Sequence, residues 1–180
     1  MALCVGLWGD ELRPRLAGDT LRVSPANLRL LAGRPLESLK NGSTVTFDFG
    51  LAALNEARIV QARTAERFVF SYDLWEERFS VVQLTAKDSR QPRASAANLL
   101  PDAAEQWCME RLAVPATALD RAQPLRLRLE IRADEPRRSG RNEDPPVSLA
   151  ALIDLFSRPA RREQRFWVLE STPFRLDTLK

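Results

Sequence analysis

The chain has 180 residues, of which 44% are hydrophobic and 28% are charged, and its formal net charge is +3. This length and composition are typical of one globular domain that buries a core of its own. The sequence contains no histidine, which excludes Ser-His-Asp and Cys-His catalysis and, nearly as firmly, zinc sites. The two cysteines, Cys4 and Cys108, form at most one disulfide bond.

Residues 2–8, ALCVGLW, form an apolar run at the beginning of the chain. The run is too short to cross a bilayer, which takes about 20 apolar residues. It resembles the end of a signal-peptide apolar region. We therefore interpret residues 1–18 as a residual signal-peptide tail or flexible arm and residues 19–180 as a single β-rich domain. A frayed apolar arm or an N-terminal edge strand is the alternative interpretation of the run.

The residues from Asp19 onward predict short extended segments separated by turn signals. The pattern predicts strands at 20–24, 28–33, 43–54 and 57–62, with one or two helical turns at 35–40. In the strand at 43–54, Val45, Phe47 and Phe49 lie on one face, and the alternation shifts at Gly50, which indicates a bulge or bend there.

Residues 67–84, RFVFSYDLWEERFSVVQL, predict a β-hairpin with one buried face and a polar turn. Trp75 lies in this turn and is a candidate binding residue. A tryptophan at this position is either an exposed anchor for a partner or a side chain folded back over the sheet edge. We favour the second interpretation, because polar turns rarely leave large aromatic side chains in water.

The second half of the chain predicts further strands and two short helices. We expect a loop at 85–97, a helix at 101–113, a strand at 125–133, a charged loop at 134–146, a short helix from Ser148, a central or covered strand at 166–169 and a last extended piece at 174–176. The order of these elements predicts a mainly β fold, an antiparallel β-sandwich or curved sheet with two or three short peripheral helices. An α+β fold is the alternative.

Three segments and the alternating Arg-Leu strand carry a resemblance to a known family. The segments are FVFSYDLWEERFSV at 68–81, VSLAALIDLFSRP at 147–159 and RFWVLESTPFRL at 165–176. Together with the export-like start, they resemble an uncharacterised family of bacterial exported proteins that is defined only as a domain of unknown function. The resemblance spans Leu21 to Leu179. It implies an extracytoplasmic, β-rich, non-enzymatic protein and supplies no functional residues.

Arginine side chains give the chain a second candidate binding site. Residues 121–165 contain 11 arginines and 7 acidic residues. Within this stretch Arg126, Arg128 and Arg132 are expected to project from one face of a strand, where they would meet an acidic protein, an anionic envelope surface or nucleic acid. An ordinary solvated strand face is the simpler interpretation. The arginines have no interleaved aromatic residues for base stacking, which argues against nucleic acid.

Carboxylates on or beside the strands are the remaining candidates for chemistry. Asp48 and Asp73, with Glu76 and Glu77, allow a glycosidase-like pair in principle. Glu76 and Glu77 are better explained as solvent-exposed residues of a turn than as a catalytic pair. We therefore expect no enzymatic activity, no cofactor and no metal.

The sequence thus predicts a non-catalytic exported bacterial protein, periplasmic or envelope-associated, that binds a protein or an anionic envelope surface. The alternative is a cytosolic nucleic-acid or regulatory binding protein that uses the arginine-rich sheet face. A small-molecule ligand is not identified by the sequence.

Overall fold

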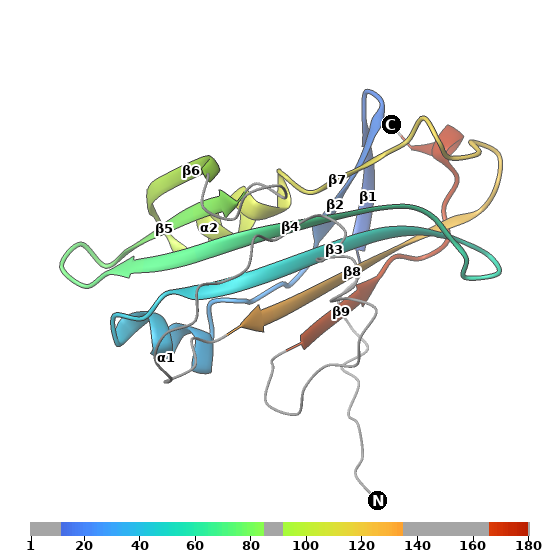
Figure 1. The fold of residues 1–180 in the computed structure, drawn as a ribbon. Helices are drawn as coiled ribbons and strands as arrows, with labels where there is room; N and C mark the ends of the chain where they lie inside the picture. Colours follow the sequence, from blue (N-terminus) through green and yellow to red (C-terminus); the bar gives the residue numbers. More distant parts are fainter. Residues whose placement is uncertain (1–11, 85–91, 135–165, 180) are drawn as a thin grey trace, which may run out of the picture.

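The fold consists of two antiparallel sheets and two short α-helices in the residues that the computed structural model describes, 12–84, 92–134 and 166–179 (Figure 1). The large sheet has the strand order β6 (Pro92–Leu99), β5 (Arg78–Leu84), β4 (Val60–Asp73), β3 (Val45–Asn55), β8 (Leu125–Asp134) and β9 (Phe166–Glu170). The small sheet has the order β1 (Leu12–Ala17), β2 (Thr20–Pro25) and β7 (Ala113–Pro115). The predicted mainly β, antiparallel fold with short helices is confirmed.

The core lies on the inner face of the large sheet, where aromatic side chains of β3 and β4 meet. The ring centroids of Phe47 and Phe70, and those of Phe49 and Phe68, are 5.1 Å apart in edge-to-face arrangements, and all four rings are fully buried. The small sheet covers this face, with β7 against β3 and β4 and with β1 against β8. The two sheets therefore share one hydrophobic core.

The helices form where the sequence predicts them. Helix α1 (Arg34–Lys40) has Pro35 in its first turn and ends before Gly42, whose φ of 80° suits glycine. Helix α2 (Pro101–Met109) begins with a proline and ends four residues earlier than expected, because the chain then turns into β7. Within the described ranges, no helix is both long enough and apolar enough to span a bilayer.

The predicted N-terminal arm is wrong for residues 12–17. These residues form β1, which pairs along its whole length with β2, and Leu12 is buried in the core. Leu12, Pro14 and Leu16 alternate with Arg13 and Arg15, but a proline within such a run argues against a strand except at the edge of a sheet, which is where β1 lies. Residues 1–11, and with them the apolar run and Cys4, lie outside the described residues.

Three further expectations about strands are wrong. Residues 92–97, expected within a loop, belong to β6 at the edge of the large sheet. Strand β9 is the opposite edge and not a central strand, and Phe166 and Val168 on its outer face are exposed. The bulge expected at Gly50 lies instead between Ala53 and Leu54. The first residue of the loop predicted at 134–146 is the last residue of β8, and the rest of that loop and the helix predicted from Ser148 lie outside the described residues.

The segment at 28–33 is not a strand, because a distant carboxylate holds it as a bend. The Oε1 atom of Glu105 on α2 accepts hydrogen bonds from the backbone N–H groups of Leu30 and Leu31, both at 2.8 Å. All three residues are buried. Burial raises the pKa of Glu105 above its ordinary value, although the two N–H donors oppose part of this shift.

We expect Glu105→Ala to lower the free energy of unfolding by about 2–4 kcal/mol, because two buried N–H groups lose their acceptor. Glu105→Gln keeps a carbonyl oxygen at the same place and should lose less. Urea unfolding of both variants measures the difference. Equal losses in the two variants would contradict the role of the acceptor.

The raised pKa of Glu105 also predicts a pH dependence, which the same variants test. Above the ordinary value of 4.5 and below the raised pKa, the folded protein keeps a proton that the unfolded chain has lost. The free energy of unfolding therefore falls as the pH rises through this window. In Glu105→Gln this decline should be smaller, and unchanged pH profiles in the variant would refute the assignment.

Candidate functional site

The turn between β4 and β5 is held by Asp73, the last residue of β4. The Oδ1 atom of Asp73 accepts the backbone N–H groups of Trp75 at 2.8 Å and Glu76 at 3.1 Å. These bonds from Glu76 and Trp75 lower the pKa of Asp73. Glu77 then adopts a left-handed φ of 53° and returns the chain to β5. The turn is therefore a defined structure and not a loose loop.

Trp75 is exposed at the tip of this turn, with 96% of its surface accessible. The expectation that its side chain folds back over the sheet is wrong. The rings of Tyr72 and Phe79 lie 4.9 Å apart at this end of the hairpin and pack against one another rather than against the indole. The defined turn displays Trp75 in solvent.

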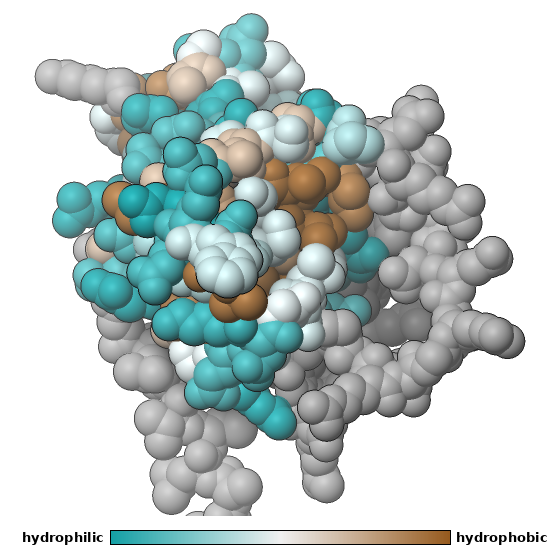
Figure 2. Space-filling view, turned by 90° about the vertical axis from the view of Figure 1, so that its left-hand side faces the viewer, coloured by the Kyte–Doolittle hydropathy of each residue, from teal (hydrophilic) through white to brown (hydrophobic). Residues whose placement is uncertain are grey.

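The surface around Trp75 combines apolar and acidic groups. Leu74 and Leu100 are also exposed, and Leu100 follows the register partner of Phe79 on the neighbouring strand. Figure 2 shows this end of the molecule, where hydrophobic residues reach the surface among hydrophilic ones. Asp73, Glu76 and Glu77 give the turn three negative charges, and Arg78 donates its hydrogen bonds to the carbonyl groups of Glu76 and Glu77.

The arginines of β8 share one face of the strand, as expected, but they do not form an open basic stripe. Arg132 is buried, and its guanidinium lies 5.1 Å from the centroid of the Phe166 ring. The Nε atom of Arg128 lies 2.8 Å from Glu130, and Nη1 lies 3.9 Å from Glu170. Arg126 is half-buried. The face therefore offers a surface much less basic than the sequence suggests.

The carboxylates considered for catalysis are not brought together. Asp48 is buried in β3, where it accepts two hydrogen bonds from Arg67 on β4, at 2.6 and 2.9 Å. Asp73 lies six residues farther along β4 than Arg67, or roughly 20 Å at the rise of a strand. The charge of Asp48 is matched by a bidentate guanidinium, which is a structural arrangement.

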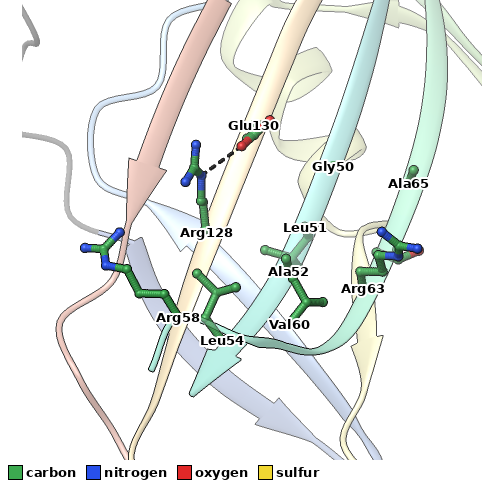
Figure 3. Close-up of a pocket in the computed structure, with 11 residues that line it drawn as sticks. Gly50, Leu51, Ala52, Leu54, Arg58, Val60, Arg63, Ala65, Arg128 and Glu130 are labelled. Carbon is green, nitrogen blue, oxygen red and sulfur yellow. Dashed lines mark ion pairs between the residues drawn. The ribbon is translucent and has the colours of Figure 1, made fainter. Parts of the chain in front are cut away.

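A hollow lies on the outer face of β3, β4 and β8, opposite the small sheet, and has a volume of about 290 Å³. Its floor consists of Gly50, Ala52 and Ala65, which are small residues at outward positions (Figure 3). The sequence analysis did not identify it. The signal was present, because Gly50 and Ala52 interrupt the larger outward-facing side chains of β3.

Three arginines, Arg58, Arg63 and Arg128, surround the hollow (Figure 3). Glu170 lies 3.3 and 3.4 Å from the two terminal nitrogens of Arg58, and Glu130 pairs with Arg128. Arg63 is exposed on the other side, and among the residues that the structure describes it makes no ion pair. The positive charge of the hollow is thus concentrated at Arg63.

Comparison with known proteins leaves the site to be judged by its geometry. No protein-family model, no curated protein and no solved structure matches this chain.

We expect Asp73→Ala to loosen the turn at 74–77 without unfolding the protein. The N–H groups of Trp75 and Glu76 lose their acceptor, so their amide hydrogens should exchange with solvent faster than in the wild type. Hydrogen exchange followed by NMR measures this. Glu77→Gln, which leaves Asp73 intact, is the matched control. Unchanged exchange at residues 75 and 76 would show that Asp73 does not hold the turn.

Proposed function

We propose that this chain is a non-catalytic, exported bacterial binding protein that acts in the periplasm or at the envelope and contacts a protein partner through the Trp75 turn. The observation that carries the proposal is the exposure of Trp75 on a turn fixed by Asp73. Tryptophan is enriched among the few residues that supply most of the energy of protein interfaces. A turn that is already ordered loses little conformational freedom on binding.

The charge of the turn indicates the chemistry of the partner. Asp73, Glu76 and Glu77 surround the apolar pair Leu74 and Trp75, so a complementary surface has an apolar pocket with a basic rim. The same charges repel anionic lipid and nucleic acid. The arginine face has less support as a nucleic-acid site, because Arg132 is buried and Arg128 is paired with glutamates.

The proposed compartment rests on the apolar run at residues 2–8 and on the resemblance to exported proteins. We expect the native product to be recovered in the periplasmic or envelope fraction, with a mature N-terminus downstream of that run. Cell fractionation followed by mass spectrometry measures both. An uncleaved product in the cytoplasm would overturn the proposed export and leave the binding turn to be tested separately.

We expect Trp75→Ala to weaken the complex with the partner by about 30-fold or more, as loss of a central aromatic anchor does. Its free energy of unfolding should stay within about 0.5 kcal/mol of the wild type, because the side chain is exposed. A photo-crosslinking residue at position 75 identifies the partner in native cells, and purified partner then allows titration of both forms.

The control for this experiment places the same crosslinking residue at Thr117, which is exposed after β7. Adducts formed equally at positions 75 and 117 would indicate random collisions. A partner that binds wild type and Trp75→Ala with the same affinity would remove the turn from the interface.

A further inference from the structure

We propose that the hollow on the outer face binds a small amphiphile that has one carboxylate head group and a short aliphatic chain. The hollow lies near the β3–β4 turn, whereas Trp75 lies at the other end of β4. The proposal is therefore independent of the partner-binding turn. Four features of the described residues carry it: the floor, the charge, the apolar end wall and the position within the sheet.

The floor follows from the strand register. Ala52 on β3 is the register partner of Arg63 on β4 and of Arg128 on β8, so a small residue lies between two long ones. In the next row, Gly50 lies between Ala65 and Glu130. Two strand spacings separate the outer strands, or roughly 10 Å. These two rows create a trough with charged sides and an uncharged floor.

The charge of the trough is asymmetric. On the β8 side, Glu130 and Glu170 balance Arg128 and Arg58, and Glu170 is shared between both arginines at 3.3 and 3.9 Å. On the β4 side, Arg63 has no acidic partner within the described part of the chain. Because one guanidinium remains without a counter-ion there, the site matches one anionic group, which a carboxylate satisfies with two parallel hydrogen bonds.

The apolar end wall of the hollow would contact the aliphatic chain of the ligand. Leu54 and Val60 line the hollow toward the β3–β4 turn, and 45% of the surface of Val60 is exposed. An aliphatic chain that runs from Arg63 over Ala52 to this wall would cover apolar surface that water now contacts. The volume of about 290 Å³ is at the lower end of ligand pockets, so the chain is short.

The position of the hollow argues against larger occupants. Strands β3 and β8 are paired on both sides where they line the hollow, so a peptide lying on its floor finds no free backbone groups there to extend the sheet. Glu130 lines the hollow, and Glu170 pairs with two of its arginines. These negative charges disfavour contact with a broad anionic membrane. A single small anion with an apolar tail meets neither obstacle.

The test is calorimetric titration of decanoate and of decanol into the full chain. We expect decanoate to bind the wild type about tenfold more tightly than decanol does, because only the carboxylate pairs with Arg63. Arg63→Gln should remove this preference. Ala52→Leu, which fills the floor, should weaken both compounds, and Arg121→Gln, at an exposed arginine in the loop after β7, should change neither.

Several outcomes overturn the proposal. The site is ruled out if the wild type binds decanoate no more tightly than decanol. It is equally ruled out if Arg63→Gln and Ala52→Leu leave decanoate binding unchanged. Binding of the wild type to phosphatidylglycerol vesicles that Ala52→Leu does not weaken would assign the face to a membrane surface instead. If thermal unfolding shows that Ala52→Leu does not fold, the comparison of decanoate with decanol in Arg63→Gln still tests the proposed site.

Discussion

The packing of four phenylalanines between β3 and β4 is the interaction on which the rest of the structure depends. Phe47, Phe49, Phe68 and Phe70 are fully buried and form edge-to-face pairs across adjacent strands. The burial of so much aromatic surface on one side of a long hairpin fixes its register, because a slip of one residue would turn these rings toward solvent. The small sheet and helix α1 contact this hairpin, and Trp107 of α2 packs edge-to-face on Phe68.

The same register determines what the opposite face presents. Once Phe49 and Leu51 point into the core, Gly50 and Ala52 must point outward, and their partners on β4 and β8 line up beside them. The hollow is therefore a consequence of core packing as much as of its own residues. The length of β4, 14 residues or roughly 45 Å, places the hollow and the Trp75 turn far apart. The two surfaces can accordingly bind different molecules.

Local sequence patterns predict the strands well but do not indicate which strands lie next to one another in the sheet. Alternation located β3, β8 and the β4–β5 hairpin, because one buried face leaves a period of two in the sequence. Alternation cannot tell an edge strand from a central one, and so β9 was expected to be covered although Phe166 and Val168 are exposed. The bend at Leu30 and Leu31 was equally hidden, since its acceptor, Glu105, is more than seventy residues away.

The two candidate surfaces also differ in how far a local stretch of sequence can predict them. The Trp75 turn is built from neighbouring residues, and Asp73, two positions before Trp75, is a local signal for an ordered turn. Such a turn fixes the backbone but not the direction of the indole, so the sequence alone does not indicate that Trp75 is exposed. The hollow needs Arg63, Ala52 and Arg128 in one row, and these residues come from three strands. Their charges balance on one side and not on the other only because β9 brings Glu170 to Arg58 and Arg128. Such an arrangement follows from strand order, which no short stretch of this sequence contains.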